Sequence, residues 1–158
     1  MKVCSKVGLI AALAVAGIFP YQFASANTIV TMGGACVNHG FGAPPSSGLQ
    51  NQDGLLLNNT GGVTYVAACH TPMVLRTEGT TMAAFVSIYA PSTGGSNVCN
   101  SQVRTRAGSM IRAAAVVMGP SWTVGRSLGS TIVSPGDAHM VVCSMSPGSI
   151  LANTTVIY

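Results

Sequence analysis

The chain has 158 residues, of which only 6% are charged, and a formal net charge of +4. A typical soluble domain carries about 25% charged residues, so neutral polar and small apolar groups must form most of this surface. The small net charge also argues against a nucleic-acid partner.

The N-terminal segment 1–26 has the features of a signal peptide. Two lysines precede an apolar run at 7–19, and small residues at 24–26 form a cleavage site. The run is shorter than the roughly 20 residues of a membrane span, although a retained N-terminal helix is the alternative. We expect cleavage before Asn27, export through the periplasm to the extracellular space or cell surface, and one domain over 27–158 without a membrane span.

Four cysteines remain after the expected cleavage: Cys36, Cys69, Cys99 and Cys143. An even number of cysteines in an exported chain indicates two disulfides. Their spacing does not match a zinc site, and we expect neither a metal nor a cofactor. Of the three possible pairings we favour Cys36–Cys69 with Cys99–Cys143, because elements adjacent in sequence are usually neighbours in space.

The first half of the expected domain alternates between β-prone runs and turn signals. A short β-prone run, Asn27–Met32, ends at two glycines, and 27–35 is an expected exchangeable N-terminal strand. Glycine and proline predict a long loop over Asn38–Asp53. Further strands are expected at 55–57, 63–69, 73–76 and 81–90.

The second half contains the clearest alternation. Over 98–107, Cys99 and its alternate neighbours share one face, while Arg104 and Arg106 lie on the other. The next segment, 110–118, has three alanines that favour a helix, but its shortness favours a strand. As a strand it would place Arg112 beside the other two arginines.

A β-hairpin closes the chain. Two apolar, β-branched runs at 138–145 and 150–158 flank the Ser-Pro-Gly-Ser turn at 146–149. Before the hairpin, Ser121–Val124 carries the only tryptophan, Trp122, and is followed by Gly125 and Gly129 on either side of Arg126. Another short strand is expected after these glycines, at 131–133. In total about eight or nine short strands, separated by frequent turns, predict an all-β, Ig-like or related antiparallel sandwich with two disulfides.

No residue pattern indicates catalysis. The histidines His39, His70 and His139 could in principle pair with Asp53 or Asp137, but no nucleophile elbow accompanies them. We therefore expect no enzyme and no catalytic residues. The arginines Arg104, Arg106 and Arg112 form a candidate face for an anionic ligand, with an ordinary solvated surface as the alternative.

An exported, disulfide-bonded, nearly lysine-free β-domain that ends in an alternating strand resembles the pilin subunits of the chaperone–usher families, most of all the archaic, spore-coat-U-like branch. The resemblance implies an incomplete sandwich completed by the N-terminal strand of the next subunit. The implied donor strand comprises Asn27, Thr28, Ile29, Val30, Thr31 and Met32. The implied partners are further copies of the chain, with an assembly chaperone or outer-membrane secretion machinery.

The leading functional hypothesis is therefore a non-enzymatic structural subunit of an extracellular filament, fimbrium or surface assembly that polymerises through strand exchange. The alternative is a monomeric secreted or periplasmic module that binds a glycan or a protein through the 38–53 loop or the Arg104 and Arg106 face. A secreted hydrolase that uses the histidines is a third hypothesis.

Overall fold

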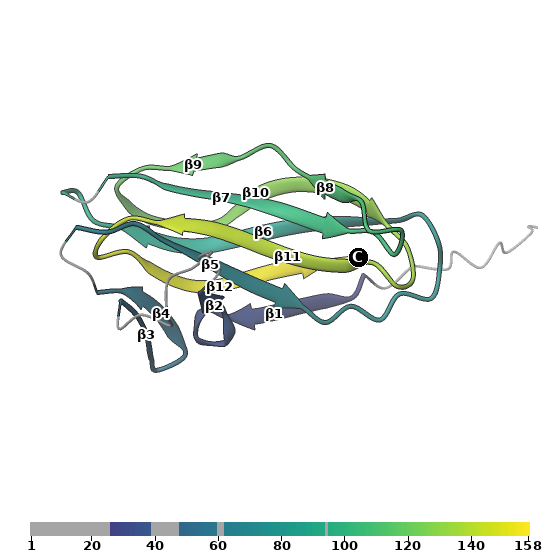
Figure 1. Ribbon diagram of the computed structural model, residues 1–158, viewed down its shortest axis with the longest axis horizontal. Coiled ribbons are helices and arrows are strands. Elements are labelled where there is room, and N and C mark those ends of the chain that lie inside the picture. Colours follow the sequence, from purple (N-terminus) through teal and green to yellow (C-terminus); the bar gives the residue numbers. More distant parts are fainter. Residues whose placement is uncertain (1–25, 39–47, 60–61, 94) are drawn as a thin grey trace, which may run out of the picture.

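The structure is a computed structural model that describes residues 26–38, 48–59, 62–93 and 95–158 (Figure 1). The predicted signal peptide up to residue 25, the middle of the predicted 38–53 loop and His39 lie outside the described residues. The described ranges form twelve β-strands and one 3-10 turn, η1 (Gly33–Ala35).

The strands form two antiparallel sheets of six strands each, which we call sheet A and sheet B. Sheet A has the order β10-β6-β12-β4-β3, and β1 pairs with β12 beside β4. Its strands are β1 (Thr28–Met32), β3 (Leu49–Gln52), β4 (Leu55–Asn58), β6 (Thr80–Ala90), β10 (Ser121–Val133) and β12 (Ile150–Ile157).

Sheet B has the order β2-β5-β11-β7-β8, and β9 also pairs with β7. Its strands are β2 (Val37–Asn38), β5 (Tyr65–Thr71), β7 (Asn97–Arg104), β8 (Met110–Arg112), β9 (Val116–Met118) and β11 (Ala138–Met145). Two antiparallel sheets with two disulfides confirm the predicted fold class, and the strand number is higher because several strands have only two to four residues.

The core lies between the sheets and follows from the alternation of the central strands. On β6, Met82, Val86 and Ile88 point inward, and on β11, Val141 and Met145 do the same, all at most 1% exposed. Each such side chain contributes about 1.5–3 kcal/mol when it is removed from water. The inward positions of β6 thereby fix which of its residues face outward.

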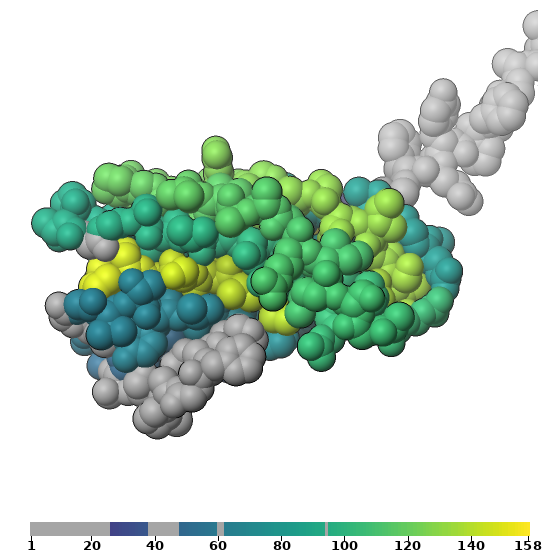
Figure 2. All heavy atoms as spheres, turned by 45° about the horizontal axis from the view of Figure 1, so that its top comes forward, coloured from purple at the N-terminus to yellow at the C-terminus, as the bar shows by residue number. Residues whose placement is uncertain are grey.

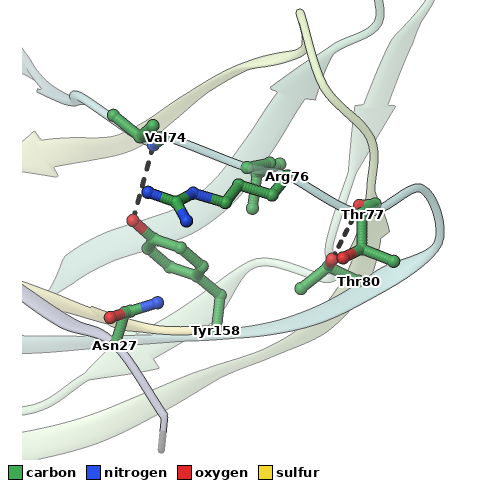
Figure 3. Close-up of a pocket in the computed structure, with 7 residues that line it drawn as sticks. Asn27, Val74, Arg76, Thr77, Thr80 and Tyr158 are labelled. Atoms are coloured by element: carbon green, nitrogen blue, oxygen red, sulfur yellow. Dashed lines mark hydrogen bonds between the residues drawn. The ribbon is translucent and has the colours of Figure 1, made fainter.

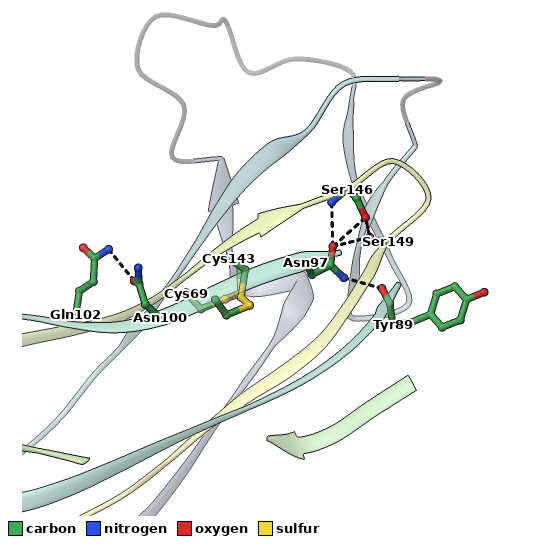
Figure 4. Close-up of a disulfide and its surroundings, with 10 residues drawn as sticks. Cys69, Tyr89, Asn97, Asn100, Gln102, Cys143, Ser146 and Ser149 are labelled. Atoms are coloured by element: carbon green, nitrogen blue, oxygen red, sulfur yellow. Dashed lines mark hydrogen bonds between the residues drawn. A yellow bond between two sulfur atoms is a disulfide. The ribbon is translucent and has the colours of Figure 1, made fainter. Parts of the chain in front are cut away.

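Both disulfides have the predicted pairing. Cys99 on β7 and Cys143 on β11 are register partners and are joined across the two strands (Figure 4). Cys36, just before β2, is joined to Cys69 on β5. All four sulfurs belong to the buried core. Two disulfides are consistent with an extracellular protein.

The predicted 146–149 turn connects β11 to β12 and is held by a buried polar network around Asn97 (Figure 4). The Asn97 Oδ1 atom accepts hydrogen bonds from the backbone N–H of Ser146 at 2.9 Å and from the Ser149 hydroxyl at 2.8 Å. The Asn97 side-chain amide donates to the carbonyl of Tyr89 at 3.1 Å. This network ties the hairpin to the end of β6.

In two regions the strands differ from the prediction. The predicted break between the Trp122 segment and 131–133 is wrong, because β10 runs from Ser121 to Val133 without interruption. Gly125 and Gly129 have positive φ angles and lie in its two register shifts, which are typical of β-bulges. Residues 110–118 form β8 and β9 on the edge of β7, not a helix.

Two predictions near the first disulfide are wrong. The last part of the expected 38–53 loop is strand β3, which forms a hairpin with β4 through Asp53 and Gly54, both at positive φ. An Asp-Gly pair is a strong hairpin signal. The expected strand at 73–76 is irregular chain. No helical segment in the described ranges is long and apolar enough to cross a membrane.

Candidate functional site on the outer face of sheet A

The described outward-facing register positions of sheet A carry no charge, and the exposed Arg126 of β10 pairs with the inward-facing Val86. On β6 the residues between the buried ones, such as Phe85 and Tyr89, face outward. Their register partners on β12 and β10 face the same way. None of these outward register positions in the described strands carries a charge. This face differs from sheet B, whose outer face bears Arg104 and Arg112.

One row of side chains crosses five neighbouring strands of this face. Its members pair in register from strand to strand, and we call them the aromatic row: Trp122 on β10, Tyr89 on β6, Ile150 on β12, Leu57 on β4 and Gln50 on β3. Because neighbouring strands lie about 4.8 Å apart, the row is about 19 Å long. It is a continuous strip with two aromatic rings at one end and an amide at the other.

Trp122 is the most accessible large side chain of the aromatic row. It is 51% exposed, and its ring centroid lies 5.5 Å from that of Tyr89 at an interplanar angle of 44°. Such a tilted arrangement is a favourable geometry for two aromatic rings. The preceding residue, Ser121, has φ 95°, a conformation that a non-glycine residue adopts only at a cost in free energy.

Neutral polar groups flank the aromatic row. A parallel row four or five residues further along the strands contains Ser127, Phe85, Thr155 and Val30, paired in register. Between the rows, Asn153 pairs with Ser87. Amides and hydroxyls of this kind both donate and accept hydrogen bonds. The face therefore offers flat apolar surface together with uncharged hydrogen-bonding groups.

In Figure 2 the C-terminal residues, in yellow, lie between the blue segment that contains β3 and β4 and the green strands. In the sheet, β12 pairs with β4 on one side and with β6 on the other. The aromatic row thus crosses the C-terminal strand, and its two ends lie on strands far apart in sequence.

The predicted arginine face is only partly assembled. On adjacent strands, Arg112 lies opposite Gln102 and Arg104 opposite Met110, which makes the two arginines diagonal neighbours. Arg106 lies beyond the end of β7, where its guanidinium forms an ion pair with Glu78 at 3.0 Å. Ligand binding by these arginines stays a prediction.

The described histidines do not assemble with the predicted aspartates. His70 is exposed on β5, whereas Asp137 accepts hydrogen bonds from the backbone N–H groups of Ser134 and Arg106. Within the ranges that the structure covers, no group of three or more histidine, cysteine or acidic side chains could hold a metal.

His139 instead faces Ser101 in the core. Its Nε2 atom lies 3.0 Å from the Ser101 hydroxyl oxygen, the spacing of a nucleophile and its base. However, the two residues are only 1% and 3% exposed, so no substrate can reach the hydroxyl. Burial lowers the pKa of His139 from 6.5 to about 4, and the ring is therefore neutral at physiological pH. The pair is part of the core.

The candidate polymerisation strand, Asn27–Met32, is already paired within its own chain. Thr28 to Met32 form β1, which lies antiparallel to β12 in continuous register. The backbone N–H of Asn27 also donates to the carbonyl of Tyr158 at 2.7 Å. The sandwich therefore has no gap beside β12 for a strand from another subunit.

Sequence reasoning located Trp122 but attached no role to it, and it missed the aromatic row. The single tryptophan was a signal that could have been followed. Its partners come from strands whose register depends on long-range pairing, which local alternation does not predict.

The comparisons with known proteins gave results only for solved structures. No family model matches the chain, and no curated protein matches it. The C-terminal CBM6 of LamC, a marine laminarinase from Zobellia galactanivorans, is 14% identical, with a TM-score of 0.50 over 84% of this chain and 100% of that chain.

Two further solved structures are less similar. A GH26-CBM35 β-(1,4)-mannanase of Podospora anserina is 10% identical, with a TM-score of 0.46, over 82% of this chain and 27% of that one. The carbohydrate-binding module CBM6cm-2 of Cellvibrio mixtus lichenase 5A, in complex with cellotriose, is 10% identical, with a TM-score of 0.44, over 81% and 95%.

The laminarinase module contradicts the resemblance to chaperone–usher pilin subunits, because the solved structure whose fold this chain shares at a TM-score of 0.50 is a carbohydrate-binding module and not a pilin. The predicted function as a filament, fimbrium or pilus subunit is wrong for the same reason, and the occupied edge of β12 gives its physical basis. At 14% identity, the likeness to the laminarinase module establishes the shared sandwich fold.

Proposed function

We propose that this protein is a secreted, non-catalytic module that binds a neutral polysaccharide along the aromatic row of sheet A. The observation that carries the proposal is the half-exposed Trp122 packed against Tyr89 on a face whose outward register positions bear no charge. The sandwich fold shared with the CBM6 module of a laminarinase supports it. The exported location rests on the predicted signal peptide and the two disulfides.

The chemistry of the face suits an uncharged sugar chain. A pyranose ring has an apolar face, which loses contact with water when it packs on an indole or phenol ring. Its hydroxyl groups need hydrogen-bond partners when they are partly buried. Asn153 and Thr155 can supply them near the rings, and Gln50 at the other end of the row. A charged sugar would have no counter-ion among the outward register positions of this face.

The length of the row favours a chain over a single sugar. The row extends over about 19 Å from Trp122 to Gln50 across five strands. A monosaccharide would cover only part of it, whereas successive units of a polysaccharide can contact the row at several points and add their binding energies.

Affinity electrophoresis tests the proposal with laminarin, a soluble cellulose derivative and mannan as neutral polymers. We expect at least one of them to retard the wild-type protein. Trp122→Ala should weaken that binding at least tenfold, about 1.4 kcal/mol, as expected for an exposed aromatic side chain that anchors a ligand.

Val117→Ala is the matched control, because Val117 is 62% exposed on β9 of sheet B and lies off the aromatic row. The control should be retarded like the wild type. Equal retardation of the Trp122 and wild-type proteins, or no retardation by any neutral polymer, would overturn the proposal.

A further inference from the structure

A pocket lies at the far end of β6 from the aromatic row (Figure 3). It has a volume of about 540 Å³ and lies between the irregular segment 74–77, the start of β6 at Thr80, and the paired residues Asn27 and Tyr158. The nine residue-to-residue steps from Thr80 to Tyr89 separate it from the aromatic row by about 30 Å of strand. A single sugar cannot contact both places.

The pocket combines one cationic side chain with an aromatic ring and neutral polar side chains. Figure 3 shows the Arg76 guanidinium extending toward the phenol of Tyr158. The Tyr158 hydroxyl oxygen accepts the backbone N–H of Val74 at 3.4 Å, which leaves its own hydrogen free to donate outward. Val74 and Leu75 supply apolar walls. Its volume is in the range of ordinary small-molecule sites, about 300–1,000 Å³.

No acidic side chain of the described residues pairs with Arg76, so its guanidinium is available to bind an anionic ligand. Glu78, two residues away, is the nearest acidic residue in the sequence, and it forms its ion pair with Arg106 instead. Among the described residues, no carboxylate lies within ion-pair distance of Arg76. A guanidinium presents a rigid fork of N–H donors that matches the two oxygens of a planar oxyanion.

We propose that this pocket binds an acidic sugar through a carboxylate or sulfate group held by Arg76. The Tyr158 hydroxyl and the Asn27 side chain would bind neighbouring sugar hydroxyls, and Val74 and Leu75 would contact the apolar ring face. The pocket therefore differs from the aromatic row in ligand charge, and the protein has two separate sugar-binding points of opposite preference.

The test is an NMR titration of the oxidised protein with D-glucuronate, D-glucose 6-sulfate and D-glucose as probes. We expect glucuronate, the sulfate ester, or both to shift the backbone amides of 74–80 and 158, and glucose to leave them unchanged. The acid that binds distinguishes a carboxylate from a sulfate ligand. Added salt should weaken the binding, because the pocket is open to water.

Arg76→Gln should weaken the binding about tenfold or more, since it removes a charge-assisted bidentate contact. Arg76→Lys should recover only part of it. Arg112→Gln removes an arginine of sheet B and is the matched control, with unchanged binding expected. Trp122→Ala should also leave acid binding unchanged, which separates this site from the aromatic row.

Three results would overturn the inference. One is equal binding of glucose and of the two acids, another is equal binding by Arg76→Gln and the wild type, and the third is a set of shifts confined to residues outside 74–80 and 158. Each of these is independent of whether neutral polymers bind at Trp122.

Discussion

His139 should make the protein lose stability as the pH falls from 7 to 4. The ring is buried between the sheets at 1% exposure, and its register partners, Thr71 on β5 and Val103 on β7, are uncharged. Burial lowers the pKa of His139 from 6.5 to about 4. The unfolded chain therefore takes up a proton near pH 6.5, while the folded protein excludes it until about pH 4.

The sign and size of the effect follow from this difference. Stability decreases as the pH is lowered wherever the unfolded state binds more protons than the native state. The contribution of neutral His139 to stability is therefore complete above pH 6.5 and is lost as the pH approaches 4. Each pKa unit corresponds to about 1.4 kcal/mol. We therefore expect the free energy of unfolding to decrease by about 3 kcal/mol through this one residue.

Urea denaturation followed by circular dichroism, with the disulfides intact, measures this free energy at pH 7, 6, 5 and 4. The carboxylates also titrate in this range, so the informative quantity is the difference between the wild type and His139→Gln. Glutamine does not titrate, and the difference should shrink by about 3 kcal/mol between pH 7 and pH 4. A difference that stays constant over this range would refute the reasoning.

Three further predictions concern stability. Gly33→Ala should lower the free energy of unfolding by about 2–3 kcal/mol in thermal or urea unfolding, because an added Cβ would overlap a backbone carbonyl of β12. An added Cβ at Gly119 meets open space, so Gly119→Ala should change this free energy little. Replacing Cys99 and Cys143 by alanine opens a link with a sequence separation of 44 and should cost about 4 kcal/mol, also measured by urea unfolding. Asn97→Ala leaves buried donors of the 146–149 turn unpaired and should cost about 2–4 kcal/mol in the same assay, so a loss below about 1 kcal/mol would contradict the network.

The sequence predicted those parts of the fold that depend on local chemistry. The alternation of β6 and β7, the hairpin at 146–149 and both disulfides follow from side-chain period, turn residues and cysteine order. The prediction from glycine was wrong where glycine forms bulges. Gly125 and Gly129 suggested the end of a strand, but β10 continues through both because it pairs with the long strand β6 on either side of them.

The candidate sites depended on long-range register, which the sequence alone did not specify. Between Tyr89 on β6 and Trp122 on β10 the chain forms β7, β8 and β9 of sheet B, and the two rings are in contact only because β10 returns to sheet A. Arg76 and Tyr158 line one pocket because the start of β6, which follows Arg76, pairs with the end of β12, which precedes Tyr158. The N-terminal strand shows the same limit, since its pairing with its own chain cannot be distinguished by pattern from pairing with a neighbour.

The most direct test of the neutral-polysaccharide site is the fluorescence of Trp122, because it is the only tryptophan in the chain. Its indole is 51% exposed on the aromatic row, so a sugar ring that packs on it must change the solvation of the fluorophore. Titration with the neutral polymer that retards the protein should shift the emission to shorter wavelength and saturate at the affinity found by electrophoresis. An unchanged spectrum at saturating polymer would show that binding takes place elsewhere and would contradict the account.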